Sequence, residues 1–178
     1  MSRTLVLATG NPGKAREVKA LLPAVEVLTL ADRPVEMPEE TGETFEANAR
    51  LKAEHAADVL GVPALADDSG LEVDALGGRP GVRSARYAPG TDEDRYRKLL
   101  DELEGEPARS ARFVCVMALA APGRETVLSR GTCEGTIALE PFGDGGFGYD
   151  PVFVVGGEDR TMANLTPEEK NARSHRGE

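Results

Sequence analysis

The stretch Leu5-Val6-Leu7-Ala8-Thr9-Gly10-Asn11-Pro12-Gly13-Lys14 joins a short apolar run to a turn and then to a helical pattern. The apolar run predicts a strand, and the glycines, asparagine and proline that follow are typical of a tight turn. From Lys14 to Leu22 the apolar residues recur at helical spacing, and Pro23 ends the pattern. We therefore predict a strand, a turn and a helix in immediate succession, which is the repeating unit of α/β proteins.

Strand and helix patterns alternate through the rest of the chain. Further strands are predicted at residues 25–30 and 63–66, and a long hairpin at 111–121 and 126–139 turns at Pro122-Gly123. Helices are predicted at residues 44–60, at 91–105 after the N-cap Thr91, and after the capping box Thr166-Pro167-Glu168-Glu169. This alternation predicts an α/β fold with a mixed β-sheet and flanking helices. Because no linker or repeat interrupts it, residues 1–178 are predicted to form a single domain.

The overall composition excludes several classes of protein. Of the 178 residues, 31 are acidic and 21 are Lys or Arg, and the formal net charge of −10 argues against binding to nucleic acid or to an anionic membrane surface. No apolar run approaches the ~20 residues that span a bilayer, and the turn at Thr9-Gly10 comes too early for a signal peptide. Cys115 and Cys133 are the only cysteines, so we expect buried, reduced thiols and a cytoplasmic protein.

The predicted helix 44–60 has an apolar and a polar stripe. Its apolar stripe comprises Phe45, Ala49, Ala53, Ala56 and Leu60. Asn48, Lys52 and His55 fall at positions i, i+4 and i+7, which puts them together on another face. These polar residues either line a cleft or form solvated surface, which is the commoner meaning of such a stripe.

The turn at residues 9–14 is the first candidate site. A helix N-terminus presents backbone N–H groups and a partial positive charge to a phosphate, and Lys14 adds a full charge. The turn is not a P-loop, because the Gly-x4-Gly-Lys-[Ser/Thr] spacing is absent and Ala15 follows the lysine. The alternative is an ordinary connection between a strand and a helix.

Two pairs of acidic residues form the second candidate. Asp67-Asp68 is predicted to lie at the carboxyl end of a short apolar strand, where open α/β sheets bind ligands, and Glu39-Glu40 lies in an acidic loop. Carboxylate oxygens, completed by water and by substrate phosphates, are the ligands that Mg²⁺ prefers. The pairs therefore indicate a magnesium site, and the alternative is solvated acids in loops.

A glycine-rich loop and a basic tail complete the candidates. Four glycines lie between Phe142 and Tyr149, and glycine lets backbone N–H groups approach a ligand. Phe147 and Tyr149 offer flat faces to a planar group and Asp150 offers an acceptor, unless the rings simply plug the core. The basic tail either clamps phosphates or a base edge, or is a solvated terminus; its members are Lys170, Arg173, His175 and Arg176.

The ordered set of motifs resembles the inosine triphosphate pyrophosphatase family from residue 4 to residue 178. The matching segments are Ala8-Thr9-Gly10-Asn11 with Lys14, Glu39-Glu40-Thr41-Gly42 with Asn48 and Lys52, Ala66-Asp67-Asp68-Ser69-Gly70-Leu71, Pro80-Gly81 with Ser84-Ala85-Arg86-Tyr87, Gly145-Gly146-Phe147-Gly148-Tyr149-Asp150-Pro151, and Ser174-His175-Arg176-Gly177. The resemblance implies an elongated mixed β-sheet with two lobes around a central cleft, and a homodimer. It also implies Mg²⁺-dependent hydrolysis of ITP, dITP and XTP to the monophosphate and pyrophosphate, which keeps deaminated purines out of DNA and RNA.

The resemblance further implies roles for individual residues. The phosphates would be held by Thr9, Gly10, Asn11, Pro12, Gly13 and Lys14, with Lys52 as a further contact. Glu39 and Asp68 would bind the metal, with Glu40 as the alternative to Glu39, and Asp68 would accept the proton of the attacking water. The substrate site would be completed by Ser69, Phe147, Gly148, Tyr149, Asp150, Lys170, His175 and Arg176. Two rival functions are a Maf-like pyrophosphatase with another base preference, and a nucleotide- or RNA-binding module without catalysis.

Overall fold

A computed structural model describes residues 4–173, so His175 and Arg176 of the predicted substrate site lie outside the described residues. The chain divides into two compact units. The first unit comprises the residues up to Asp68 together with Cys115–Arg130, and the second comprises Ser69–Val114 together with the residues from Gly131 onward. The prediction of a single domain over residues 1–178 stays a prediction.

The strands form one mixed six-stranded sheet with the order β2-β1-β3-β4-β5-β6. Their bounds are β1 Thr4–Leu7, β2 Glu26–Thr29, β3 Ala64–Val73, β4 Ser110–Ala120, β5 Val127–Ile137 and β6 Phe153–Val155. Strand β1 pairs in parallel with β2 and with β3, whereas β5 and β6 are antiparallel. The predicted α/β fold with a mixed sheet is confirmed.

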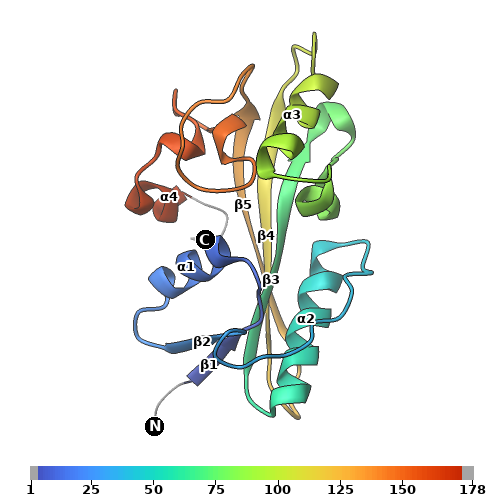
Figure 1. Ribbon diagram of the computed structural model, residues 1–178, viewed down its shortest axis with the longest axis vertical. Coiled ribbons are helices and arrows are strands. Elements are labelled where there is room, and N and C mark those ends of the chain that lie inside the picture. The colour runs from blue at the N-terminus through green and yellow to red at the C-terminus, as the bar shows by residue number, and fades with distance from the viewer. Residues whose placement is uncertain (1–3, 174–178) are drawn as a thin grey trace. The chain divides into compact units, whose positions relative to one another are not determined.

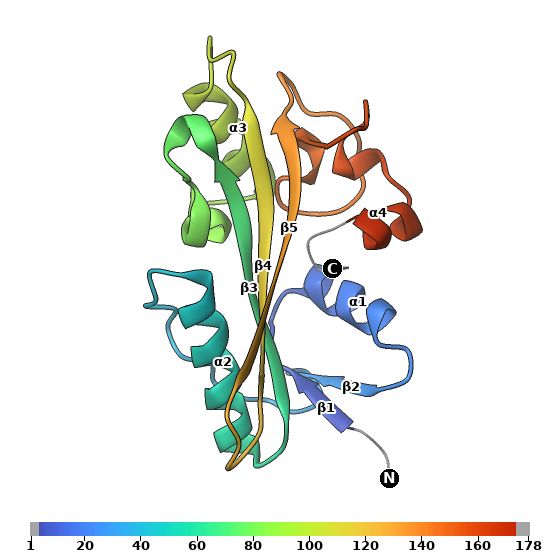
Figure 2. The same cartoon turned by 180° about the vertical axis from the view of Figure 1, so that it is seen from behind.

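In the first unit, helices α1 (Pro12–Leu21) and α2 (Phe45–Leu60) lie on opposite faces of the sheet (Figures 1 and 2). Val18 of α1 packs with Leu7 of β1 and Leu65 of β3 in one apolar cluster. The predicted apolar stripe of α2 is largely correct, because its phenylalanine and alanines are buried; only Leu60 remains partly exposed. Successive strand residues face opposite sides, so the sheet can carry a helix on each face.

In the second unit, helices α3 (Asp92–Glu102) and α4 (Pro167–Arg173) accompany the continuing strands and β6 (Figure 1). Short 3₁₀ segments lie at Asp74–Leu76, Gly81–Arg86, Asp150–Val152 and Met162–Asn164. The core of this unit includes Leu99 of α3, Leu103 directly after that helix, and the rings of Phe113 and Phe153, whose centroids are 4.4 Å apart. The unit thus has an apolar core of its own.

The predicted N-cap Thr91 and the predicted capping box at Thr166 are both confirmed. Thr91 Oγ1 accepts the N–H of Asp94, while the Asp94 carboxylate accepts the N–H of Thr91. Thr166 and Glu169 make the same reciprocal pair at the start of α4. Each box satisfies backbone donors that the first helical turn leaves without partners. The helix starts therefore follow directly from local sequence.

Cys115 and Cys133 are both buried and form no disulfide with each other, as predicted. Among residues 4–173, no helix has the length and apolar character that would be needed to cross a membrane.

Candidate active site

Asp67 and Asp68 lie inside a strand and not at its end. The sequence predicts a strand at 63–66 followed by an acidic turn, but β3 runs on to Val73. That prediction is wrong because both carboxylates find polar partners within the first unit, so the backbone does not need to leave the sheet to solvate them. The two residues are 2% and 5% exposed, respectively. The alternative of solvated acids in a loop is therefore excluded for this pair.

Lys14 neutralises one of these buried acids. The Lys14 Nζ atom lies 3.3 Å from Asp67 Oδ2, and the two side chains are 16% and 1% exposed. Asn11 precedes α1 as its N-cap and accepts the N–H groups of Gly13, at 2.9 Å, and of Lys14, at 3.2 Å. Since these two backbone donors already have a partner, the charge that this turn offers to an anion is chiefly that of the Lys14 ammonium group.

Lys52 and Asn48 project from α2 into the same unit. Lys52 Nζ lies 3.2 Å from Glu40 Oε1, and Lys52 is largely buried. Asn48 is completely buried, and its side chain hydrogen-bonds both the N–H and the carbonyl oxygen of Gly42. The expectation of a solvated polar stripe is therefore wrong for these two residues. His55, the third member of the stripe, is only partly buried and lies with Nε2 2.8 Å from the Glu36 carbonyl oxygen.

Asp68 is the carboxylate on which these groups act. Burial raises the pKa of Asp68 above its ordinary value, while the Lys52 charge opposes that shift. The Glu40 charge raises it further, and the Asn48 amide and the Lys14 charge lower it. The acids Asp67, Asp68 and Glu40 thus share one environment with two lysines. A carboxylate in such surroundings is a candidate general base.

The site fits a divalent cation that is completed by substrate. Among residues 4–173, three carboxylates share this neighbourhood with two lysine ammonium groups, which favours an added positive charge. Asp68 Oδ2 is buried and has no hydrogen-bond partner among residues 4–173. In that part of the chain, no group of three or more His, Cys, Asp or Glu residues could hold a metal ion. One or two carboxylates with phosphate oxygens and water are the usual set for Mg²⁺.

The two rings of the glycine-rich loop have different environments, which decides between the two predicted interpretations. Tyr149 is 5% exposed within the core of the second unit, and its hydroxyl donates to the Ser84 carbonyl oxygen at 2.8 Å. Burial raises its pKa. Phe147 is only half-buried, and the Lys170 ammonium lies 4.5 Å from its ring centroid. Tyr149 is therefore a core residue, and Phe147 is the ring that remains partly exposed.

Asp150 and Lys170 hold this loop from within. Asp150 Oδ2 accepts the N–H of Phe147 at 3.0 Å and lies 2.7 Å from Lys170 Nζ. Asp92, at the start of α3, accepts the N–H of Gly148 at 2.8 Å. A side chain at Gly148 would be strained, because its φ is +63°. Of the predicted residues in the second unit, four are thus brought together: Phe147, Gly148, Asp150 and Lys170.

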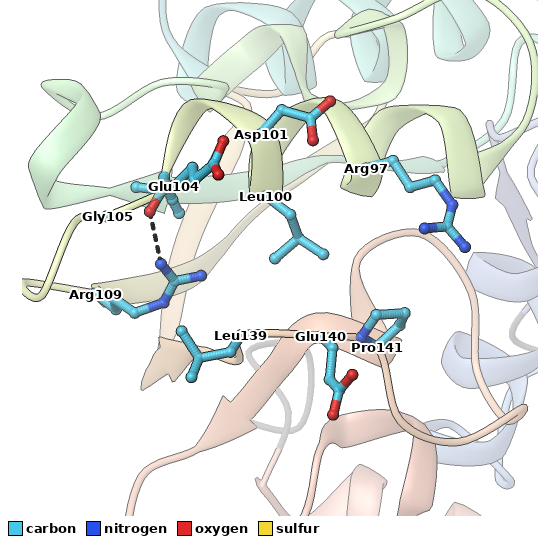
Figure 3. Close-up of a pocket in the computed structure, with 10 residues that line it drawn as sticks. Arg97, Leu100, Asp101, Glu104, Gly105, Arg109, Leu139, Glu140 and Pro141 are labelled. Carbon is cyan, nitrogen blue, oxygen red and sulfur yellow. Dashed lines mark hydrogen bonds between the residues drawn. The ribbon is translucent and has the colours of Figure 1, made fainter.

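A pocket of about 460 Å³ in the second unit is no candidate for this chemistry (Figure 3). None of the predicted site residues lines it. The guanidinium groups of Arg97 and Arg109 lie at its opposite ends. Arg109 donates to the carbonyl oxygens of Leu103, Ile137 and Ala138, and Arg97 pairs with Glu93, so both arginines are already engaged.

Three residues of the site were not assigned individual roles by sequence reasoning. Asp67 holds Lys14, Asn48 holds Gly42 and lowers the pKa of Asp68, and Asp92 holds Gly148. The spacing of Asn48 and Lys52 was the one local signal for a buried polar face. Nothing local distinguishes Asp92 from the other acids in the first turn of α3.

The mixed sheet and the buried cluster of carboxylates and lysines define an α/β protein with a charged, buried site. The chain belongs to the Ham1 family, whose model matches residues 5–178. It is 55% identical to a dITP/XTP pyrophosphatase of Geobacillus kaustophilus, over 98% of this chain and 89% of that protein. A second dITP/XTP pyrophosphatase, from Exiguobacterium sp., is 52% identical over 98% of this chain and 91% of its own length.

Solved structures agree with the fold. A HAM1 protein from Coxiella burnetii superposes with a TM-score of 0.90 at 47% identity, covering 99% of this chain and 93% of that one. The nucleoside-triphosphatase / dITP/XTP pyrophosphatase from Mycobacterium abscessus gives a TM-score of 0.80 at 46% identity, covering 98% and 95%. The two structures therefore share the fold of this chain over nearly its whole length.

Proposed function

We propose that this protein hydrolyses deaminated purine nucleoside triphosphates, such as dITP, ITP and XTP, to the monophosphate and pyrophosphate. The observation that carries the proposal is the buried Asp68, whose pKa burial raises and which shares its surroundings with Lys52, Glu40 and Lys14. The similarity to two dITP/XTP pyrophosphatases supports the substrate class. A binding module without catalysis would gain nothing from burying several carboxylates with their attendant cost.

Asp68 is the proposed general base. A carboxylate with a raised pKa can accept a proton from the water that attacks the phosphate chain. Lys14 and Lys52 would neutralise the charge that develops on the transferring phosphoryl group and on the departing pyrophosphate. Residues 9–13 would lie along the phosphates, with Lys14 as their charged member. In this scheme the ion pairs with Asp67 and Glu40 hold the lysines ready before substrate arrives.

Mg²⁺ is the proposed metal. When bound, it would supply charge neutralisation and orientation of the phosphate oxygens. Asp68 is the proposed first ligand. Glu39, the predicted second ligand, is exposed, whereas the Glu40 carboxylate lies near enough to Asp68 to raise its pKa. These observations favour Glu40 as the second carboxylate.

Recognition of the base is proposed for residues of the second unit and the tail. Phe147 is the proposed stacking ring, because Tyr149 is committed to the core. Ser69, Gly148, Asp150 and Lys170 would complete the substrate site. His175 and Arg176 would donate to the 6-keto oxygen, which adenine lacks; a buried polar match of this kind discriminates strongly, because the wrong base leaves donors without partners.

Two further proposals concern the state of the protein. A homodimer is proposed from the family resemblance, and analytical ultracentrifugation tests it directly. A cytoplasmic location is proposed because the two cysteines are not joined in a disulfide, which suits a reducing compartment.

The decisive experiment is pyrophosphate release by an Asp68→Asn variant with Mg²⁺ and dITP. The amide cannot act as a base, so we expect a loss of at least about 10²-fold in kcat, as for removal of a general base. Asp58→Asn, which changes an exposed aspartate on α2, is the matched control and should retain the native rate. Native turnover by Asp68→Asn would refute the assigned mechanism.

A substrate panel separates the proposed function from its rivals. We expect hydrolysis of ITP, dITP and XTP well above that of GTP, ATP, dTTP and UTP. Preference for dTTP or UTP would instead indicate a Maf-like pyrophosphatase. Binding of nucleotide without hydrolysis of any of them would indicate a binding module.

A further inference from the structure

The side chain of Asn48 connects two segments that the proposed reaction needs together. It lies on α2, is completely buried, and has a partner for both of its polar atoms. Its Oδ1 atom accepts the N–H of Gly42 at 2.8 Å, and its Nδ2 atom donates to the Gly42 carbonyl oxygen at 3.2 Å. The Asn48 amide also lies close enough to the Asp68 carboxylate on β3 to lower its pKa. One carboxamide therefore fixes the end of the acidic loop and acts on the proposed base.

We propose that Asn48 is a positioning residue that holds the Glu39-Glu40-Thr41-Gly42 segment in register with Asp68, so that the carboxylates of the two segments can bind one divalent cation. The proposal rests on the proposed function for the identity of the metal site. Asn48 itself touches neither metal nor substrate in this scheme. It acts as the hydrogen-bonded support that fixes ligand carboxylates, a role that outer residues commonly play in metal sites.

The fit between Asn48 and Gly42 supports a dedicated contact. A Cβ atom at residue 42 would lie 2.5 Å from Asn48 Oδ1 and 2.9 Å from the Ala47 Cβ. Glycine is therefore required for the backbone to approach the carboxamide this closely. Because both the N–H and the carbonyl oxygen of Gly42 bond the same carboxamide, the two hydrogen bonds fix the orientation of the Gly42 backbone as well as its distance from Asn48. Glu40 is held nearby through its ion pair with Lys52, one helical turn beyond Asn48.

The same loop has a second link to α2, which offers a control. His55 Nε2 lies 2.8 Å from the Glu36 carbonyl oxygen, four residues before Glu40. This contact joins the same helix to the same loop but involves neither Gly42 nor Asp68. If tethering of the loop alone matters, loss of His55 and loss of Asn48 should have similar effects. If the link to Asp68 matters, only loss of Asn48 should impair the site.

The test measures binding of Mn²⁺ alone, by electron paramagnetic resonance, to the full chain and to its Asn48→Ala and His55→Ala variants. We expect Asn48→Ala to weaken Mn²⁺ binding by roughly 10- to 100-fold, the range for loss of an outer support. The Mg²⁺ concentration for half-maximal hydrolysis of dITP should rise in parallel, and kcat should fall more than KM changes at subsaturating Mg²⁺. His55→Ala should leave Mn²⁺ binding within about twofold of the native protein, on the same reasoning.

A second variant approaches the contact from the other side. Gly42→Ala keeps Asn48 but displaces its carboxamide, so it should weaken Mn²⁺ binding in the same direction. It also carries the test if Asn48→Ala does not fold, as judged by circular dichroism. Native Mn²⁺ affinity in a folded Asn48→Ala or Gly42→Ala protein would overturn the proposal, as would equal weakening by His55→Ala. Because Mn²⁺ binding is measured without turnover, it decides this proposal even if the native protein hydrolyses no nucleotide tested.

Discussion

Replacing Lys14 with methionine should destabilise the protein even though the residue lies at the edge of a turn. The substitution keeps the length and apolar character of the stem and removes the ammonium group. Asp67, whose side chain is 1% exposed, then loses the cation that lies 3.3 Å from its Oδ2 atom. Breaking a buried pair is costly chiefly because the remaining charge stays out of water.

The size of the effect follows from the geometry. At an effective dielectric constant of about 20, two unit charges 3.3 Å apart attract by about 5 kcal/mol. Part of that attraction is offset in the native protein by the desolvation of Lys14, which is 16% exposed and so retains some water. Loss of one partner of a buried pair typically costs about 3–5 kcal/mol, and the partial exposure favours about 3 kcal/mol here.

Urea unfolding followed by far-ultraviolet circular dichroism at pH 7 measures this change. With an m-value of about 2 kcal/mol/M, a loss of about 3 kcal/mol lowers the midpoint by about 1.5 M. The double variant Lys14→Met/Asp67→Asn removes the stranded charge and should recover much of the loss. An unchanged midpoint in Lys14→Met, or a double variant no more stable than the single one, would refute the reasoning.

The remaining predictions concern the second unit. Tyr149→Phe removes a buried hydrogen bond to the Ser84 carbonyl oxygen, so it should lower the free energy of unfolding by about 1–3 kcal/mol with little change in KM for dITP. Phe147→Ala should raise that KM with a smaller effect on stability. Urea titrations and initial rates measure both effects, and the reverse pattern would show that Tyr149 is the stacking ring. The hydrogen bond from Arg160 and the Thr166 N–H lower the pKa of Glu169 to about 2. Because this folded-state pKa lies below the ordinary 4.5, the stabilisation is complete above that value and is lost as the pH falls through 2. Glu169→Gln should therefore have a lower melting temperature than the native protein at pH 7, and the gap should close between about pH 4.5 and pH 2; a gap independent of pH would contradict the ion pair.

Local patterns in the chain were sufficient for most of its secondary structure. The predicted strand, turn and helix at residues 5–22 correspond to β1 and α1, and the predicted helix 44–60 corresponds to α2. The N-cap Thr91 and the capping box at Thr166 correctly predicted the starts of α3 and α4. These features depend on residues within a few positions of one another: apolar spacing along a helix, a hydroxyl that accepts the N–H three residues on, a proline that ends a pattern. The types of residue that could bind phosphate and metal were visible for the same reason.

The burial of polar residues depended on partners distant in the chain, so local patterns misplaced it. Asp67-Asp68 looked like the end of a strand, because the lysines and the asparagine that allow these acids to stay in β3 come from α1 and α2. From the sequence, Tyr149 and Phe147 were equal candidates for stacking on a base. Only the fold brings Ser84 close enough to accept the Tyr149 hydroxyl and so keep that ring in the core.

The amino-acid sequence by itself thus determined the α/β class, the order of the elements and the chemical types available to a site. Only the tertiary structure decided which polar groups are buried together. It also decided that the charge of Glu40 acts on Asp68 while Glu39 is exposed, and that Asn48 holds Gly42. The physical reason is that helix and strand formation are governed by neighbours along the chain. Desolvation of a charge is instead governed by whatever the fold brings around it.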